Sequence, residues 1–468
     1  MIVRPLVIVG AGPAGMAAAI AAAEVGLEPL VIDENPQIGG QIHRQPPAPL
    51  ASKPADSHGR AARRGSELLS RFRANQGRIT LLSGTSVWAV FPPRRVAIRG
   101  PQGAEMIEAE QLILAQGAFE YVPPFPGWTL PGVMTPGGAQ QMVKIMRVRP
   151  GRRALVAGSG PFLLVVAEQL HRAGMEVAGV VEAASTAELV AALPRLWLHP
   201  SLAWDGMGYL NRLRRAQVPI HRGQIVVAAE GERELCRVVV APCDTEWRPD
   251  TSRARTIDAD TLAIAYGFAP RTQLAQLAGC KMRFANELGG WVPEVDKSLE
   301  TSVPGVWVAG DGGGAAGALV AQDQGTLAAL AAGRRSGAVD SIAFARATAG
   351  ILRRLRRLRH FRAILDRLSQ IRPGLDTLAT PDTIVCRCEE LTRAEVAGGL
   401  AFGGTDLRTL KVMTRLGMGA CQGAMCWPAA ARWIAAQSGR SIGEIGPASV
   451  RPPVSPVCVG DLAAEISP

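Results

Sequence analysis

Four cysteines near the C-terminal end of the 468-residue chain form two closely spaced pairs. Cys386 and Cys388 flank a single arginine, and Cys421 and Cys426 follow 32 residues later as Cys-x4-Cys. Paired thiolates bind a [2Fe–2S] cluster or a structural zinc ion. Each pair falls at an expected turn, after TIV and after LGMG, where glycine-rich backbone supplies N–H donors to sulfur. The sequence therefore predicts a metal site at these four residues, and unliganded core cysteines are the remaining alternative.

The first nucleotide-binding motif stands at the N-terminus, in PLVIVGAGPAG. Residues 6–9 predict a buried strand, 10–15 a glycine-rich turn, 16–25 a helix, and 30–32 a second strand. The order strand, turn, helix, strand is that of a dinucleotide-binding fold.

Each glycine of this turn has a physical role. Gly10 permits the tight turn, Gly12 lets the backbone approach a pyrophosphate on the helix N-terminus, and Gly15 lets helix and strand pack closely. Asp33 stands 18 residues after Gly15, where a carboxylate can hydrogen-bond a ribose hydroxyl, and Glu34 is a weaker candidate for that role. The predicted nucleotide contacts here are Gly10, Gly12, Pro13, Ala14, Gly15, Asp33 and Glu34.

Two further segments indicate which dinucleotide binds. IGGQ, with Gly40 and Gln41, follows the second strand, and VPGVWVAGDGGG is a strand that runs into Gly310 and Asp311 before a helix. A carboxylate at a strand end can accept hydrogen bonds from a ribityl chain, while the helix dipole faces phosphate. This arrangement resembles the glutathione-reductase-like flavoproteins, in which these segments surround FAD.

The resemblance to these flavoproteins spans roughly residues 1–340. It includes Gly117 in LILAQGA, with Gln116 where the family usually has threonine. Disulfide reductases of this architecture keep a redox cysteine pair just beyond IGGQ, but IHRQPPAPLASKPA contains none. The chain is therefore not expected to be a disulfide reductase, and its flavin must exchange electrons with another group.

A second strand, turn, helix, strand motif follows in ALVAGSGPFLLVVAEQLHRAGMEVAGVVEAA. Gly158 and Gly160 form the turn and Glu182 ends the second strand, which predicts a second dinucleotide fold inserted in the first. Leu163 replaces the third glycine, and its branched side chain is expected to push the helix from the strand or close the adenosine cleft. A nicotinamide site, a structurally held adenine nucleotide and an empty scaffold all remain open. Arg271, after this insert, is either a phosphate contact or a surface residue.

Two considerations favour a [2Fe–2S] cluster over zinc at the C-terminal thiols. A Cys-x-Cys pair is less typical of zinc ribbons than Cys-x-x-Cys, and a flavin upstream needs an electron carrier. Lys411 and Arg415 lie close enough in sequence to add positive charge to an anionic site. The other cysteines lack ligand spacing and are expected to be ordinary buried or surface residues: Cys236, Cys243, Cys280 and Cys458.

CRCEELTRAEV and LKVMTRLGMGACQGAMCWP resemble the bacterioferritin-associated ferredoxin domain, which binds [2Fe–2S] through Cys-x-Cys and a later cysteine pair. With FPGWTLPGVMTPGGAQ, APCDTEWRPD, YGFAPRTQL and GDGGG, nearly the whole chain resembles the FAD subunit of hetero-oligomeric opine oxidases, D-hydroxyproline dehydrogenases and hydrogen cyanide synthases. The resemblance implies a partner, similar to D-amino-acid or sarcosine oxidases, that oxidises an amino-acid C–N bond. It also implies that this subunit relays electrons through its cluster, with room for a small third subunit.

The elements that position these residues agree with an α/β chain. Hydrophobic residues make up 47% and aromatic residues 5%, with 52 glycines, which suits helices packed on parallel sheets. The net charge of +11 indicates dinucleotide phosphates or an acidic partner, and no nucleic acid, because no aromatic-interleaved basic platform accompanies it. Residues 5–23 carry no charge, but glycines and a proline divide them, so neither a membrane span nor a signal peptide is predicted. A cytoplasmic location follows, in which the cysteines stay reduced.

A basic amphipathic helix is expected in ILRRLRRLRHFRAILDRLSQI, because six apolar residues recur at helical spacing between arginines. These residues are Leu352, Leu355, Leu358, Phe361, Leu365 and Leu368. Such a helix can lie on an anionic membrane at its inner face. Its internal position favours docking of the C-terminal domain, or of an acidic partner, against the flavin domain.

The expected architecture is two interleaved Rossmann-like dinucleotide-binding domains and a small, mainly helical iron–sulfur domain. The FAD-binding domain takes two segments, residues 1–118 and 276–340, and an NAD(P)-like domain at 119–275 is inserted between them. A basic helical linker at 341–380 precedes the cluster domain at 381–468. The favoured function is an electron-transferring FAD/[2Fe–2S] subunit of an amino-acid dehydrogenase. The rivals are a self-sufficient NAD(P)H-dependent flavin reductase and a non-enzymatic scaffold with zinc.

Overall fold

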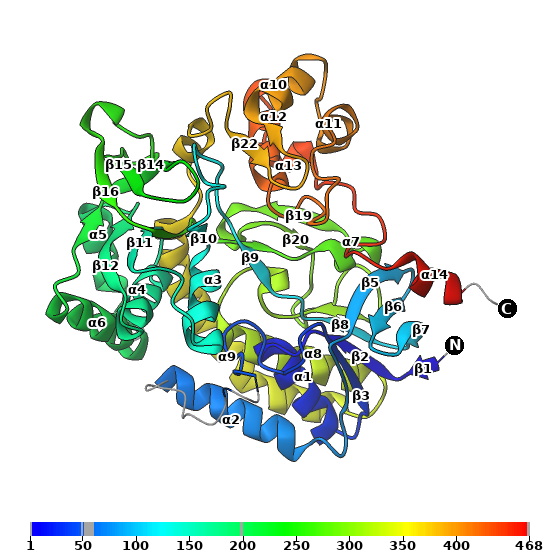
Figure 1. The fold of residues 1–468 in the computed structure, drawn as a ribbon. Helices are drawn as coiled ribbons and strands as arrows, with labels where there is room; N and C mark the ends of the chain where they lie inside the picture. Colours follow the sequence, from blue (N-terminus) through cyan, green and yellow to red (C-terminus); the bar gives the residue numbers. More distant parts are fainter. Residues whose placement is uncertain (1, 48–49, 51–59, 197–199, 466–468) are drawn as a thin grey trace.

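The computed structural model describes residues 2–47, 50, 60–196 and 200–465. Figure 1 shows two groups of strands and helices side by side, with α10 to α13 (residues 393–445) lying above them and the last helix, α14 (Val459–Glu465) in red, at the right beside β5 to β7 (residues 86–109). Each of the two groups is built on a five-stranded parallel sheet.

The first sheet has the strand order β21-β8-β2-β3-β4, and all of its pairings are parallel. Its strands are Val306–Val308, Leu112–Leu114, Leu6–Val9, Pro29–Asp33 and Thr80–Ser83. The central strands are continuous apolar runs because both faces of the sheet are covered. Helices at residues 13–24 and 318–335 pack on one face, and strands between residues 86 and 109, with the helix at 273–277, pack on the other. Since β21 comes from far downstream in the chain and pairs with β8, this domain is assembled from two separate segments.

Helix α1 (Pro13–Glu24) and helix α8 (Ala318–Arg335) pack closely on one another beside this sheet. Helix α1 is rich in alanine, and a Cβ atom at Gly325 in α8 would overlap the carbonyl oxygen of Ala14. The small residues therefore allow the two helix backbones to approach, as the glycine and alanine content of the sequence predicts. Helix α2 (Arg60–Ala74) lies on the outer side of α1.

The second sheet has the order β10-β17-β11-β12-β13, again with parallel pairings. Its strands are Val133–Met134, Thr261–Ala265, Arg153–Gly158, Glu176–Glu182 and Ile220–Arg222. Four helices accompany it: α3 (Pro136–Gln141), α4 (Phe162–Arg172), α5 (Thr186–Leu196) and α6 (Pro200–Arg215). This is a second dinucleotide-binding fold, inserted between strands β8 and β21 of the first, so the predicted interleaved α/β architecture is confirmed.

Smaller sheets, mostly antiparallel, complete the two folds. One contains the antiparallel strands β5 (Ser86–Phe91), β6 (Arg95–Gly100) and β7 (Gly103–Ala109), with β1 (Ile2–Arg4) parallel to β7 at its edge. Others are β14 (Gln224–Glu230), β15 (Arg237–Pro242) and β16 (Arg255–Asp258), and the pair β19 (Met282–Ala285) and β20 (Gly290–Pro293). The antiparallel pair β9 (Ala118–Glu120) and β18 (Phe268–Pro270) carries the chain into and out of the insert.

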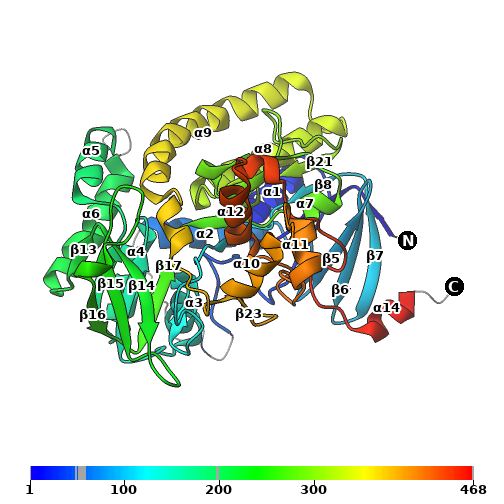
Figure 2. The same cartoon turned by 90° about the horizontal axis from the view of Figure 1, so that it is seen from above.

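Helix α9 (Ser341–Ser369) confirms the predicted amphipathic helix. It begins at Asp340, whose side chain accepts hydrogen bonds from the N–H groups of Ile342 and Ala343. Its apolar face packs against α8, where Ile351 and Leu355 are buried together with Leu327. Figure 2 shows α9 running from α8 to α5, so the helix contacts both dinucleotide folds. The side chains of Phe361 and Leu365 lie outside the described residues.

The C-terminal part is small and mainly helical, as expected. After β22 (Ile384–Cys386) and β23 (Leu391–Thr392) come helices with short connections: α10 (Arg393–Ala401), α11 (Leu407–Thr414), α12 (Trp427–Ser438), α13 (Ile442–Ile445) and α14 (Val459–Glu465). Helices α10 to α13 share an apolar core, which includes Val396, Leu410 and Ile434, whereas α14 lies against β7. Among the described helices, none is long and apolar enough to span a membrane.

Candidate cofactor and electron-transfer site

The first glycine-rich turn has the geometry that a bound pyrophosphate requires. Gly10 has φ +103°, and a Cβ atom there would overlap the carbonyl oxygen of Ala115, while one at Gly15 would overlap that of Gly10. A Cβ atom at Gly12 would be in ordinary van der Waals contact with the Cα atom of Gly40, at 3.7 Å, and would meet nothing closer. The first turn of α1 has no side-chain cap and no acidic residue, so its N–H groups are available to an anion.

Asp33 and Glu34, the two candidates for a ribose contact, lie in different surroundings. The buried Asp33 carboxylate accepts the N–H of Ala11 at 2.5 Å, and the backbone and side-chain N–H groups of Asn35 at 2.8 Å each. Each carboxylate oxygen accepts more than one hydrogen bond, so Asp33 can hold the turn and still meet a hydroxyl. Glu34 is exposed and pairs with Arg271 at 3.2 Å, whose guanidinium stacks on Phe119.

The loop that contains IGGQ lies directly over the first turn. Gly40 has φ +59°, and a Cβ atom there would stand 2.7 Å from the Cα atom of Gly12. The side-chain oxygen of Gln41 accepts a hydrogen bond from Gln141 in α3, at 2.8 Å. Gly117, at the end of the loop after β8, has φ +74° and no neighbour within 4 Å of an added Cβ. The structure therefore brings Gly40 to Gly12 and leaves open space at Gly117.

Asp311 stands between strand β21 and helix α8, as the sequence predicts. Its Oδ1 atom accepts the N–H groups of Ala316 and Gly317, at 2.9 and 3.2 Å. Its Oδ2 atom makes no hydrogen bond within the described part of the chain. Gly310 packs on Ala14, because a Cβ atom there would lie 2.9 Å from the Cβ of Ala14. The carboxylate is thus fixed beside the turn of α1, with one oxygen left for a ligand, and the donor set fits FAD.

Three titratable side chains near this loop have no sequence motif to mark them. Burial, followed by the charge of Lys144, lowers the pKa of His43 to about 4. Burial also lowers the pKa of Lys144, whose Nζ donates to the carbonyl of Ile42 at 3.0 Å. Burial raises the pKa of Glu120, although the side chain of Thr135 and the N–H of Gly137 hydrogen-bond to it. From the sequence alone, these three side chains could have been identified as candidates only because they lie near the IGGQ and PGGA segments.

The second glycine-rich turn is formed as predicted, but its cleft differs. A Cβ atom at Gly158 would overlap the carbonyl oxygen of Ala265, and Glu182 accepts the N–H groups of Gly160 and Ala184, both at 3.1 Å. Burial raises the pKa of Glu182 to about 7, against the opposing effect of these two hydrogen bonds. Leu163 is 1% exposed and packs in the core between α4 and the sheet. Its side chain therefore does not close the adenosine cleft, contrary to one of the two expectations.

The four predicted thiol ligands lie together in the C-terminal part. The side chain of Cys386 interacts with that of Cys426, and the side chain of Cys388 with that of Cys421. Charge interaction between Cys421 and Cys426 links the two pairs. Among the described residues, no three His, Cys, Asp or Glu side chains surround a point where one metal ion could sit. Two pairs of thiols are the arrangement that a two-iron cluster requires, because each iron takes two cysteines.

Backbone N–H groups point at these sulfurs. The Cys426 thiol and then the N–H groups of Gly417, Glu389 and Cys388 lower the pKa of Cys386 to about 5, although burial opposes them. Burial raises the pKa of Cys421, against hydrogen bonds from the N–H groups of residues 425 and 423. Donors of this kind stabilise an anionic sulfur site, as the glycines in LGMGACQG suggest.

Trp427 explains why the chain around the second cysteine pair is rich in glycine. A Cβ atom at Gly417 or at Gly423 would overlap the indole ring, so both glycines are needed for the backbone to wrap around it. Lys411 stacks on the same ring, with its Nζ 5.4 Å from the ring centre. Arg415 pairs with Glu389 at 2.8 Å, next to Cys388. The two cations named from the sequence therefore lie near the thiols, each held by a neighbour.

Little-exposed polar contacts join the thiol-bearing part to the insert, through Trp128, and to the segment after α9, through Asp376. Trp128 donates its indole N–H to the carbonyl of Ile384 at 2.5 Å, two residues before Cys386. Arg432 pairs with Asp376 at 2.6 Å, with both side chains less than one fifth exposed. An ion pair so little exposed is less screened by solvent than a surface pair. These contacts hold the candidate cluster site against the dinucleotide folds.

Two interleaved dinucleotide folds, with an uncapped glycine turn and a carboxylate at the start of α8, define a flavin-dependent oxidoreductase. Residues 4–325 match the family model described as pyridine nucleotide-disulphide oxidoreductase, and residues 381–466 match the sarcosine oxidase A3 domain.

Known proteins resemble the chain over nearly its full length. It is 38% identical to hydrogen cyanide synthase subunit HcnB of Pseudomonas aeruginosa, covering 98% of this chain and 97% of the relative. It is 33% identical to an opine oxidase subunit of Agrobacterium tumefaciens, covering 98% and 91%. The crystal structure of L-proline dehydrogenase from P. horikoshii has the same fold, with a TM-score of 0.73 at 22% identity, over 98% of this chain and 79% of that one.

The chain belongs to the pyridine nucleotide-disulphide oxidoreductase family and, within it, to the group that contains hydrogen cyanide synthase subunit HcnB and the opine oxidase subunit of Agrobacterium tumefaciens. It is therefore an FAD-dependent oxidoreductase, and the names of these relatives describe them as subunits of larger enzymes.

Proposed function

We propose that the chain is the electron-transferring FAD/[2Fe–2S] subunit of a hetero-oligomeric amino-acid dehydrogenase. Its substrate class would be that of opine, D-hydroxyproline or glycine oxidation, carried out with a partner similar to D-amino-acid or sarcosine oxidases. The names of the relatives support this class, since they include a hydrogen cyanide synthase, opine oxidases and sarcosine oxidase alpha subunits. The partner's site takes the amino acid, and this chain works in the cytoplasm.

The pairing of the four thiols is the observation that carries the proposal. Cys386 with Cys426, and Cys388 with Cys421, supply two sulfurs to each of two irons. A bound cluster supplies a one-electron carrier between the flavin and an external acceptor. The backbone N–H groups at the thiols stabilise the negative charge that such a carrier holds.

The flavin site follows from the same contacts. Gly12 and the first turn of α1 receive the pyrophosphate, Asp33 meets the ribose, and the free oxygen of Asp311 accepts a ribityl hydroxyl. Gly40, Gln41 and the segment at Gly117 border the cofactor. Residues 1–118 and 276–340 then hold FAD, and residues 381–468 hold the cluster.

Replacing Cys388 by alanine tests the cluster. The anaerobically purified wild-type chain should contain two irons and two acid-labile sulfides, and dithionite should produce the EPR signal of a reduced [2Fe–2S] centre. Cys388→Ala should abolish or strongly change this signal and leave the FAD content unchanged, because the flavin motifs lie on other elements. Cys236→Ala, at an exposed cysteine of the insert, is the matched control and should leave both unchanged.

The same variant separates electron transfer from a structural role. In the complex with its partner, Cys388→Ala should block electron delivery to an external acceptor while amino acid still reduces a flavin. Zinc in place of iron, or full steady-state turnover by the cluster-free variant, would show that the thiols are a structural clip and that the proposal is wrong.

A further inference from the structure

The glycine turn of the second dinucleotide fold is covered by the end of helix α9. Gly160 is the second glycine of this turn, the position where backbone normally approaches a pyrophosphate. A Cβ atom on Gly160 would lie 3.5 Å from the Cβ of Ser369, and one on Gly267 would lie 3.5 Å from the carbonyl oxygen of Ser369. Since these are ordinary van der Waals distances, the last residue of α9 fills the space that a pyrophosphate would take.

The electrostatics of the contact match its shape. Helix α4 begins directly after this turn and has neither a side-chain cap nor an acidic residue in its first turn. The partial positive charge of such an N-terminus normally attracts an anion. Here the last residue of α9 lies over the turn, with its Cβ atom near Gly160 and its carbonyl oxygen near Gly267. The end of α9 thus lies where an anion would approach α4, and it brings the opposite partial charge.

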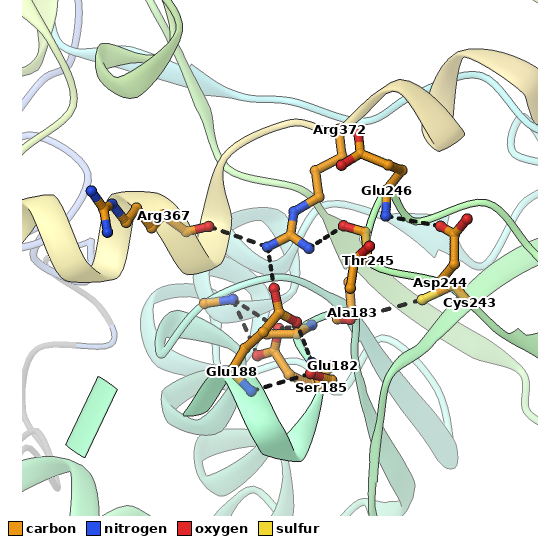
Figure 3. Close-up of polar contacts among 12 residues, drawn as sticks. Glu182, Ala183, Ser185, Glu188, Cys243, Asp244, Thr245, Glu246, Arg367 and Arg372 are labelled. Carbon is orange, nitrogen blue, oxygen red and sulfur yellow. Dashed lines mark hydrogen bonds and ion pairs between the residues drawn. The ribbon is translucent and has the colours of Figure 1, made fainter. Parts of the chain in front are cut away.

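Arg372 anchors the chain just beyond α9 to the insert, as Figure 3 shows. Its guanidinium donates to Glu188 in α5 at 2.6 Å, to the carbonyl of Thr245 and, at 3.3 Å, to the carbonyl of Arg367. It also stacks on Trp247, with its carbon atom 4.8 Å from the ring centre. The Arg372 side chain is only 15% exposed. A planar, nearly buried arginine with several acceptors is held far more firmly than a surface ion pair.

The middle of α9 is fixed to the flavin fold. Arg354 pairs with Asp323 in α8 at 2.6 Å, and Arg362 donates to the carbonyl of Ala315 at 2.7 Å, just before α8. The buried Ile351 and Leu355, on either side of Arg354, pack on α8. Residues 341–372, here called the strap, therefore bind both dinucleotide folds at once.

We propose that the strap closes the second dinucleotide fold to nicotinamide and adenine nucleotides and holds the insert in one orientation against the flavin fold. Ser369 and Arg372 are then specificity-determining residues, because they remove NAD(P)H as a source of electrons. Of the three alternatives left open by the sequence, this selects the empty scaffold. The inference rests on the geometry of α9 and the insert, and not on the presence of a cluster.

The nucleotide content of the wild-type protein tests the closure. Acid release from the purified full chain should yield FAD and no second adenine nucleotide. Equilibrium dialysis should detect no saturable NADH binding up to about 1 mM, the upper end of ordinary Michaelis constants. A second adenine nucleotide at about one per chain, or one-to-one binding of NADH, would overturn the closure. If the four thiols proved not to hold a cluster, these nucleotide-binding results would not change. The closure of the second fold and the presence of a cluster are therefore tested independently.

Hydrogen–deuterium exchange tests the anchoring. Arg372→Ala should raise amide exchange at least about tenfold in α5 and in residues 366–378, while exchange in α1 and the flavin absorbance stay at wild-type levels. The matched control is Arg353→Ala, which removes an exposed arginine of the same helix and should change neither. Wild-type exchange in the Arg372→Ala protein would show that the strap is not held at this point and would overturn the inference.

Discussion

At the scale of single residues, two positions decide whether FAD stays bound. A valine at Gly12 would fill the space where backbone and pyrophosphate meet, and an alanine at Asp311 would remove the carboxylate beside α8. We expect Gly12→Val and Asp311→Ala each to lose most of their FAD during purification, as measured by the flavin absorbance per chain. Gly77→Val, at an exposed glycine with no neighbour within 4 Å, should retain it. Wild-type flavin content in both site variants would refute this assignment.

The roles of these glycines follow from the sequence because steric needs within one turn are local. The partners that make the glycines necessary are not local: Ala115 stands opposite Gly10, and Gly40 opposite Gly12. The same limit applies to Asp33, whose position at a strand end was predicted, while its hydrogen bond to Ala11 was not. Spacing likewise identifies Cys386 and Cys388, but which distant thiol each one meets depends on the folded loop around Trp427.

At the scale of elements, helix α9 shows what periodicity predicts and what it leaves open. The spacing of Leu352, Leu355 and Leu358 predicts a helix with one apolar face, and this is confirmed. Periodicity does not say which surface receives that face, because many apolar surfaces would suit it. The structure places α8 against it and the insert at its end, so the contact with the flavin domain agrees with the sequence and the contact with the insert is new. Docking of the C-terminal domain, or of an acidic partner, through this helix stays a prediction.

The segment after the strap depends on a glycine at a close approach. A Cβ atom at Gly374 would overlap the backbone of Trp247, which cannot move cheaply. Gly374→Ala should therefore lower the free energy of unfolding by about 1–3 kcal/mol, as overpacking does, and thermal unfolding measures this. Gly398→Ala, in α10 with open space around it, should be neutral or stabilising by about 0.5–1 kcal/mol. Equal melting temperatures for the two variants would contradict the packing argument.

At the scale of the whole molecule, the order of the motifs predicts the interleaved architecture. A strand ending in Gly310 and Asp311 can complete the first fold only if the intervening chain forms a unit of its own, and β21 does pair with β8. The relation between the two folds could not be predicted, because it depends on contacts such as that of Ser369 with Gly160. That contact, rather than Leu163, closes the second site.

The route of electrons into the complete enzyme follows from this arrangement. With the second fold closed by the strap, neither NADH nor NADPH should bleach the flavin of the isolated chain in a stopped-flow experiment, even at about 1 mM. Dithionite should bleach it fully, which controls for a flavin that cannot be reduced. In the complex obtained by co-expression with the partner, the amino-acid substrate should then reduce the flavin of this chain without any nicotinamide nucleotide. Rapid bleaching of the isolated chain by either nucleotide would instead identify a self-sufficient reductase, in which the insert delivers hydride to FAD.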